Sequence, residues 1–144
     1  MIIRYAKYMP TDSQKLAQSV VRLSRRLRQE RQSELTATQL SVLGTIRTKG
    51  PLTPSTIAAY ERVQPPSMTR TVNCLVDAGL ATRVQHPDDG RQILIMISDK
   101  GHAVLAEELA RRDQWIAKRF GELDPAERKI LREATAILAK LATT

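Results

Sequence analysis

The sequence predicts a mainly α-helical protein that carries one small β-hairpin. Capping signals and apolar stripes at helical spacing recur along most of the 144 residues. One stretch around residue 90 instead combines turn residues with a run of β-branched residues. A chain of this length buries one modest hydrophobic core, so a single domain is expected.

The first helix is predicted to begin after Thr11 and to run to about residue 32. Thr11 and Gln14 have the spacing of a capping box, in which each side chain bonds the backbone amide of the other residue. Apolar residues then recur three or four positions apart and form one stripe: Leu16, Val20, Leu23 and Leu27. A helix with one apolar stripe is expected to pack that side against another element.

Two shorter helices are predicted next. Thr36 and Gln39 form a second capping box, and Gly50-Pro51 ends the helix that it opens. Thr53-Pro54 begins a two-turn helix through Tyr60, because proline is favoured at the first helical position.

A third short helix is expected to begin at Pro65-Pro66 and to stop at Gly79. Proline is tolerated only in the first turn of a helix, so the proline pair marks a break and a new start. Its inward face is predicted to carry the apolar residues at helical spacing: Met68, Val72 and Leu75. The three short helices, separated by tight turns, are expected to form one unit.

A β-hairpin is predicted from residues 81–86 and 92–98. The segment between them is turn material that contains Asp89-Gly90, a strong hairpin signal. An isolated hairpin is at best marginally stable, so this one must pack against the preceding helices. Three helices followed by a hairpin predict a winged helix-turn-helix over residues 36–98.

Two further helices are predicted, from Ser98-Asp99 to Gly121 and from Asp124-Pro125 to the C-terminus. The last one has a wide apolar stripe: Ile130, Ala134, Ile137 and Leu141, flanked by Leu131 and Leu138. The excess apolar surface of the long terminal helices needs a second subunit. Residues 1–35 and 99–144 are therefore expected to be dimerisation helices of a homodimer, within one compact domain overall.

The charge of the chain favours an acidic partner. It has 23 lysines and arginines against 15 aspartates and glutamates, a formal net charge of +8. Double-stranded DNA is favoured over a membrane, because no apolar run approaches the roughly 18–20 residues that span a bilayer. The first twelve residues have no secretion signal, and the single cysteine excludes an internal disulfide. A cytoplasmic protein is expected.

The helix that begins at Pro65 is the first candidate DNA-binding element, because the second helix of a helix-turn-helix enters the major groove. The candidate contacts on this helix are Pro66, Ser67, Thr69, Arg70, Thr71 and Asn73. Arg70 can bind guanine or a phosphate, and the hydroxyls can reach phosphate oxygens. The alternative is that Ser67 and Thr69 only satisfy the start of the helix.

The tip of the hairpin is the second candidate, with Asp89, Gly90 and Arg91. Arg91 beside Gly90 is suited to the minor groove, where narrow A·T stretches attract arginine. Asp89 is expected to hold Arg91 or a nearby backbone amide by a charge-assisted hydrogen bond, since a carboxylate against phosphate is unfavourable.

No catalytic residue, cofactor or metal site is expected. The sequence lacks a Gly-rich phosphate loop, a nucleophile elbow and a Ser/His/Asp arrangement. His86 and His102 have no cysteine partner, so each is predicted to be a surface or satisfied histidine and not a ligand. Cys74 is predicted to fill space on a partly covered face, and a redox role is the less favoured alternative.

Several motifs resemble the MarR (multiple antibiotic resistance regulator) family of bacterial transcription factors. The Asp89-Gly90-Arg91 tip followed by residues 97–101 (ISDKG) is similar to the family's wing and the start of its next helix. Residues 66–70 (PSMTR) and 75–80 (LVDAGL) resemble its recognition helix and exit. The resemblance covers nearly the whole chain. It implies a homodimer that binds a pseudo-palindromic operator, usually as a repressor, and is often released by a phenolic or lipophilic ligand or by oxidation.

One alternative keeps this fold but changes the partner: a winged-helix protein-interaction module without operator binding. Such a module does not need an exposed Arg70 or an arginine at the hairpin tip, so both residues favour DNA. The sequence does not identify an effector pocket.

Overall fold

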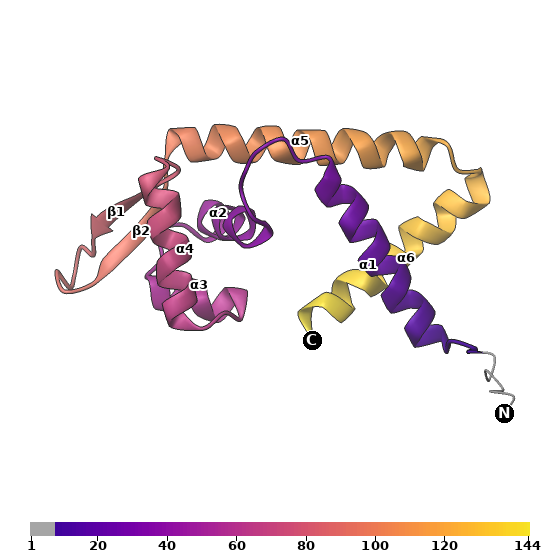
Figure 1. Cartoon of the computed structure of the whole chain (residues 1–144), viewed down its shortest axis with the longest axis horizontal. Coiled ribbons are helices and arrows are strands. Elements are labelled where there is room, and N and C mark those ends of the chain that lie inside the picture. Colours follow the sequence, from indigo (N-terminus) through magenta and orange to yellow (C-terminus); the bar gives the residue numbers. More distant parts are fainter. Residues whose placement is uncertain (1–7) are drawn as a thin grey trace, which may run out of the picture. The chain divides into compact units, whose positions relative to one another are not determined.

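A computed structural model describes residues 8–144, which form six α-helices and one antiparallel pair of strands (Figure 1). In chain order the elements are α1 (Asp12–Gln29), α2 (Ala37–Lys49), α3 (Pro54–Glu61), α4 (Pro65–Asp77), β1 (Ala81–Gln85), β2 (Ile93–Ile97), α5 (Asp99–Gly121) and α6 (Pro125–Thr143). The predicted fold class, mainly helical with one hairpin, is confirmed. The first helix ends at Gln29, somewhat before its predicted end near residue 32.

The chain divides into two units. One unit comprises residues 32–111, with α2, α3, α4, the hairpin and the first half of α5. The other comprises residues 8–31 together with Arg112–Thr144, and so contains α1, the second half of α5 and α6. We refer to the first as the winged unit and to the second as the terminal unit.

The predicted capping residues begin their helices. Thr11, Thr36 and Asp124 each form a complete capping box, in which the side chain accepts the amide at the third helical position and that residue's side chain accepts the cap amide in return. Thr53 accepts the amide of Thr56 at 3.2 Å. Helix α4 has no side-chain cap and begins instead with its proline pair, which removes two of the N–H groups that a helix start leaves unpaired.

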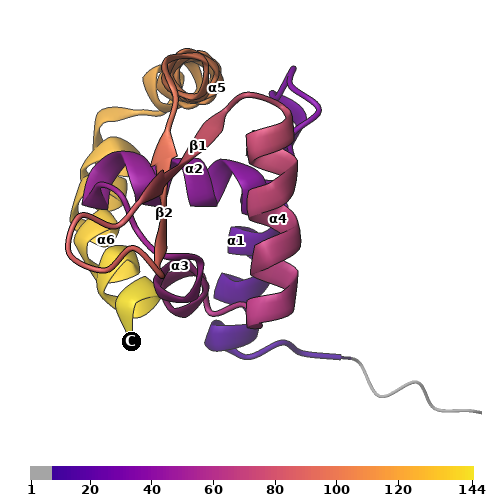
Figure 2. The ribbon, with the colours of Figure 1, turned by 90° about the vertical axis from the view of Figure 1, so that its left-hand side faces the viewer.

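The core of the winged unit is formed where α2, α3, α4, the hairpin and α5 meet (Figure 2). Its buried apolar residues are Val42, Leu43, Ile46, Ile57, Ala58, Met68, Val72, Leu75, Leu80, Ala81, Ile95 and Leu105. Met68, Val72 and Leu75 line the inward face of α4, as their spacing predicts. This packing fixes which side of α4 faces solvent.

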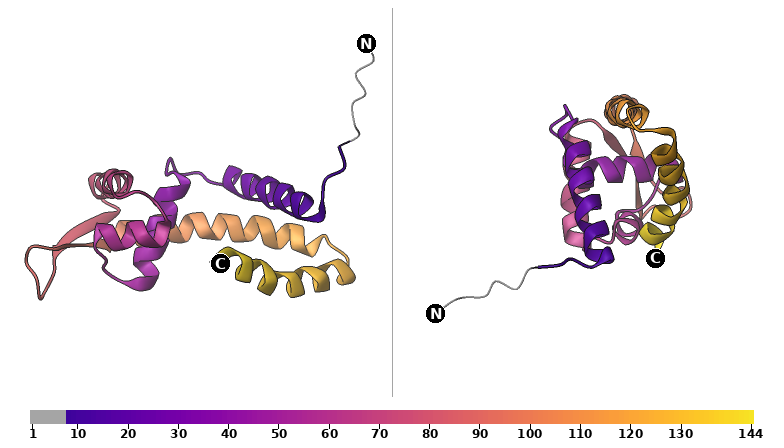
Figure 3. Two further views of the ribbon diagram at one scale, coloured as in Figure 1. Left: turned by 90° about the horizontal axis from the view of Figure 1, so that it is seen from below. Right: turned by 90° about the vertical axis from the view of Figure 1, so that its right-hand side faces the viewer.

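The hairpin packs on this core and projects beyond the helices of the winged unit (Figure 3). Its strands pair from Ala81 opposite Ile97 to Gln85 opposite Ile93. Leu52, in the turn between α2 and α3, adds a short bridge to Ile95, with backbone N···O distances of 3.2 and 2.7 Å. This bridge connects the hairpin to the helices and helps to stabilise it, because an isolated pair of strands is at best marginally stable.

The hairpin turn contains Asp89-Gly90, as predicted, but it is longer than a tight two-residue turn. A tight turn of that kind needs a positive φ at glycine, and Gly90 does not have one. His86 closes the loop instead: its amide donates to the carbonyl of Gln92 at 3.0 Å. Its Nδ1 accepts the amides of Asp88 and Asp89 at 3.1 and 3.2 Å. Of the two predicted alternatives, a surface or a satisfied histidine, the bonds of Nδ1 make His86 a satisfied one.

The joint between the hairpin and α5 depends on a close backbone approach. Ser98 donates its hydroxyl to the carbonyl of Gly79 at 2.6 Å and accepts the amide of Gly101 at 3.0 Å. Gly101 is buried, and a Cβ atom at this position would lie 2.1 Å from the carbonyl oxygen of Leu80. Only glycine allows α5 to begin this near to the segment that leaves α4.

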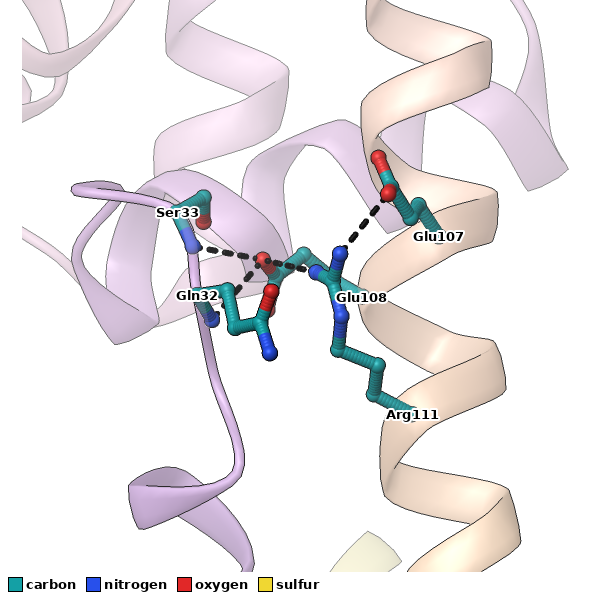
Figure 4. A network of polar contacts seen from close by, with 5 residues as sticks. All are labelled: Gln32, Ser33, Glu107, Glu108 and Arg111. Carbon is teal, nitrogen blue, oxygen red and sulfur yellow. Dashed lines mark hydrogen bonds and ion pairs between the residues drawn. The ribbon is translucent and has the colours of Figure 1, made fainter.

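A buried carboxylate attaches the segment before α2 to α5 (Figure 4). Glu108 is 6% exposed, and its Oε1 accepts the amides of Ser33 at 2.8 Å and Gln32 at 3.3 Å. Arg111 lies 3.4 Å from the same oxygen and also pairs with Glu107 at 2.7 Å. These partners offset the cost of burying the charge. They also explain why α1 stops early, since these two amides bond to α5 and not to preceding carbonyls.

The terminal unit leaves its apolar stripes uncovered within one chain. No residue of α1 or α6 is buried. Ile130 and Ile137 of α6 are each 62% exposed, and Leu16 and Val20 of α1 are 45% and 46% exposed. Within this unit, the ring of Trp115 of α5 makes cation–π contacts with the guanidinium of Arg26 of α1 at 4.9 Å and with that of Arg119 at 5.6 Å.

Candidate nucleic-acid interface

The outward face of α4 presents a cationic side chain between small polar ones. Because Met68, Val72 and Leu75 point into the core, Ser67 and Arg70 are exposed. Among the described residues, the Arg70 guanidinium has no hydrogen bond or ion pair. Arg70 is therefore available to bind a negatively charged or acceptor-rich partner without first breaking an internal contact.

The hydroxyls on this helix are not equivalent. Thr69 donates its hydroxyl to the carbonyl of Pro65 at 3.1 Å, and Thr71, which is half-buried, donates to the carbonyl of Ser67 at 3.1 Å. A hydroxyl has one proton, and a phosphate oxygen only accepts, so either threonine must give up its helix bond to contact a phosphate. The Ser67 hydroxyl has no such bond among residues 8–144, and Pro66 is exposed in the first turn.

Asn73 lies on the exposed side of α4 and is bonded to a residue that the sequence did not single out. Its Oδ1 accepts a hydrogen bond from Nη2 of Arg83, an exposed residue of β1. The two residues are ten positions apart and meet because β1 packs against α4. The sequence does not reveal this pair, because Asn73 lies on a helix and Arg83 on a strand, and the periodicity of one element does not show which residues of the other it meets.

The hairpin tip places a second free cation in solvent. Asp89 accepts the backbone amide of Arg91 at 3.1 Å, as expected for its carboxylate. Gln85 donates its side-chain amide to the carbonyl of Gly90 at 3.1 Å. These bonds order the backbone on both sides of Gly90, while the Arg91 guanidinium has no partner among the described residues and is exposed. The tip therefore presents one arginine beside an Asp89 carboxylate that is already bonded to the loop backbone.

Three other features of the described residues concern metal ligands, the cysteine and membrane-spanning helices. Within residues 8–144, no three His, Cys, Asp or Glu side chains gather closely enough to hold a metal ion. Cys74 is exposed on α4 and has a free thiol, so it does not lie on the partly covered face that was predicted for it. No helix in the described range is long and apolar enough to cross a membrane.

Comparisons with known proteins agree with this arrangement. The model of the MarR family matches residues 35–93, which include α2, α3, α4 and β1 and end at the first residue of β2. Two helix-turn-helix-type transcriptional regulators, from Mycobacterium bovis and Mycobacterium tuberculosis, are each 41% identical to the chain over 127 residues. These alignments cover 88% of this chain and 89% of each relative.

Solved structures extend the similarity over both units. A transcriptional regulator from Pseudomonas aeruginosa matches with a TM-score of 0.81 and 31% identity, over 94% of this chain and 99% of that one. Bordetella bronchiseptica BpsR, whose DNA binding is regulated by 6-hydroxynicotinic acid, matches with a TM-score of 0.69 and 22% identity, over 95% and 99% of the two chains. The second match shows the fold alone. From the family match, the near full-length relatives and the winged helix-turn-helix, the chain belongs to the MarR family of DNA-binding transcriptional regulators.

Proposed function

We propose that the protein represses transcription by binding a pseudo-palindromic operator as a homodimer. One observation carries this proposal: two exposed arginines without internal partners, Arg70 on the outward face of α4 and Arg91 at the hairpin tip. Helix α4 enters the major groove, and the hairpin tip follows the neighbouring minor groove. The proposed DNA-facing residues are Pro66, Ser67, Thr69, Arg70, Thr71, Asn73, Asp89, Gly90 and Arg91.

The two arginines have different roles in this proposal. Arg70 binds a guanine edge, which makes it a base-reading residue. Arg91 binds the electronegative minor groove, where sequence acts through groove width. Asp89 and Gly90 shape the tip and do not themselves bind phosphate, because the carboxylate is bonded to the Arg91 amide.

Binding to DNA duplexes selected from a randomised library tests these roles by fluorescence anisotropy. Arg70→Ala is expected to cost about 1–3 kcal/mol and to relax preference at one base pair per half-site. Arg91→Ala is expected to weaken binding most on A·T-rich flanks. Arg132→Gln, on α6, removes the same charge elsewhere and serves as the control. If wild type and both alanine variants bind equally well, this surface does not contact DNA, and a protein-interaction module becomes the better account.

The homodimer is assigned to the long helices of residues 1–35 and 99–144, with residues 36–98 as the DNA-binding region. The uncovered stripes of α1 and α6 support this assignment, because exposed apolar side chains at helical spacing are costly in a monomer. Obligate interfaces bury upward of roughly 2,000 Å². A partner's stripes supply such an area.

Light scattering at micromolar concentration tests the dimer. Wild type is expected to have twice the chain mass of 16.2 kDa. Ile137→Glu places a charge in the apolar stripe of α6 and is expected to give monomers. Arg132→Glu lies on the opposite side of the same helix and is expected to leave the dimer intact. A single chain mass for wild type contradicts the assignment.

We also propose release from DNA by a small phenolic or lipophilic effector. Membership of the MarR family supports this part of the proposal, and regulation of BpsR by 6-hydroxynicotinic acid is an example among proteins of the same fold. Titration of phenolic carboxylates into the protein–DNA complex, followed by anisotropy, is expected to identify a compound that lowers DNA affinity. A ligand that binds the free protein without changing DNA affinity contradicts effector release.

A further inference from the structure

The contact between Asn73 and Arg83 fixes the orientation of a side-chain amide on the proposed DNA-binding face. The carbonyl oxygen of Asn73 faces the Arg83 guanidinium and accepts its proton. Arginine has five N–H donors and no acceptor, so the opposite orientation would place N–H groups against N–H groups. The amide nitrogen of Asn73 must therefore point away from Arg83.

This orientation changes what Asn73 offers to a base. A free asparagine binds adenine through two bonds, in which its oxygen accepts from N6 and its nitrogen donates to N7. With its oxygen held against the Arg83 guanidinium, Asn73 turns its N–H donors away from Arg83, and its carbonyl keeps only one lone pair to accept a further bond. Guanine presents two acceptors in the major groove, O6 and N7, whereas adenine presents a donor beside its one acceptor.

We propose that Arg83 is a specificity-determining residue, which makes Asn73 select guanine over adenine at one base pair in each half-site. The inference rests on the proposed function, because it requires α4 to lie in the major groove. Arg83 acts through Asn73. Strand β1 packs against α4 (Figure 2). The guanidinium of Arg83 thereby reaches the side-chain amide of Asn73. A residue of β1 thereby affects which base a residue of α4 prefers.

The geometry favours this role over a purely structural contact. Both side chains are exposed, so the bond is not needed to satisfy a buried polar atom. The donor is charged, and charge-assisted hydrogen bonds hold their geometry better than neutral ones. The Asn73 amide also shares the exposed side of α4 with Arg70, three residues earlier, and residues at that spacing are neighbours on one helix face.

In vitro selection from a randomised duplex library provides the test, because the protein itself then chooses its preferred sequence. Wild type, Arg83→Met and Arg83→Lys are each used to select duplexes from the library. The base frequencies in the three sets of selected duplexes are then compared position by position. Arg83→Met removes every donor and releases the Asn73 oxygen. At one position per half-site, it is expected to shift the selected base from guanine to adenine. Arg83→Lys keeps a charged donor and is expected to keep guanine.

Paired duplexes that differ only at this base pair then give the ratio of affinities. The guanine-to-adenine ratio is expected to fall about tenfold or more in Arg83→Met, the discrimination that one good base contact provides. A general loss of affinity from the missing charge cancels in this ratio. In an Asn73→Ala background the same Arg83→Met change is expected to leave the ratio unaltered, because the residue that reads the base is gone.

The outcomes separate this inference from the proposed function. If wild type selects no sequence, or Arg70→Ala binds as tightly as wild type, the DNA-binding role of α4 is wrong. If Arg70→Ala loses affinity but Arg83→Met selects the same bases as wild type, α4 reads DNA and the role of Arg83 is refuted. A change of preference that persists without the Asn73 side chain also refutes it, since Arg83 then contacts the DNA directly.

Discussion

Substitution of Gly101 by alanine is expected to be the most damaging single-methyl change in the winged unit. The added Cβ would lie 2.1 Å from the carbonyl oxygen of Leu80 and 2.8 Å from Cγ1 of Ile97. Relief requires α5 to withdraw by more than roughly 1 Å, because nonbonded carbon and oxygen atoms are comfortable only near 3.5 Å. The carbonyl of Leu80 also accepts the amide of Ser98 at 3.1 Å, so withdrawal strains the hydrogen bonds of the joint.

The loss of stability in Gly101→Ala is the sum of the steric clash and the strained hydrogen bonds. Overpacking costs about 1–3 kcal/mol. Withdrawal also strains two hydrogen bonds, from the Ser98 amide to the Leu80 carbonyl and from the Gly101 amide to the Ser98 hydroxyl, at about 1 kcal/mol each. A loss of about 3–5 kcal/mol in the free energy of unfolding is therefore expected, a large part of the total for a domain of this size. The joint also orients the hairpin, so DNA affinity is expected to fall with stability.

Urea denaturation followed by circular dichroism measures the effect, at one fixed protein concentration because an oligomer's stability depends on it. Gly44→Ala is the matched control: Gly44 lies inside α2, and a Cβ there meets nothing within 4 Å. That control is expected to raise stability by about 0.5–1 kcal/mol, since glycine is unfavourable in a helix interior. If Gly101→Ala unfolds at the wild-type urea concentration, the close approach that we describe does not constrain the fold.

Three other predictions concern single interactions. Glu108→Leu leaves two backbone amides without an acceptor and is expected to cost about 2–4 kcal/mol in urea denaturation, clearly more than Glu108→Gln, which keeps one; equal losses would contradict the bonding described. His86→Ala removes the Nδ1 atom that accepts the amides of residues 88 and 89 in the hairpin loop, so amide hydrogen exchange at these two residues is expected to become faster. DNA affinity is expected to fall several-fold, with the melting temperature little changed. The salt dependence of DNA binding is expected to have a slope of about −5 to −7 for roughly 6–8 phosphate contacts, and a double Arg22→Gln/Arg25→Gln variant is expected to keep that slope. A shallower slope for the variant would place α1 against the DNA backbone.

The positions of the helices could be predicted from the sequence because the signals that begin a helix are local. The capping residues Thr11, Thr36, Thr53 and Asp124 begin helices as predicted, since a cap and its partner amide lie within four residues of each other. The spacing of the apolar residues of α4 also identified its inward face, and with it the exposure of Arg70. Such features need only the geometry of one helix.

The hairpin shows where local inference ends. Its strands and the turn that contains Asp89-Gly90 lie where the sequence predicts them, but Gly90 has no positive φ, and Nδ1 of His86 accepts the loop amides. Several loop conformations can satisfy the same turn residues, and the choice among them depends on which side chain is free to accept the loop amides.

Contacts between distant segments were decided only by the tertiary structure. Glu108 bonds amides that are 75 and 76 positions away, and Arg83 reaches Asn73 only because β1 packs on α4. Likewise, the need for glycine at position 101 comes from the Leu80 carbonyl on the facing segment. Each of these depends on two elements meeting at a particular distance and angle, which the periodicity of either element does not specify. The sequence by itself therefore determined the elements and their faces, and packing determined which polar groups those faces bring together.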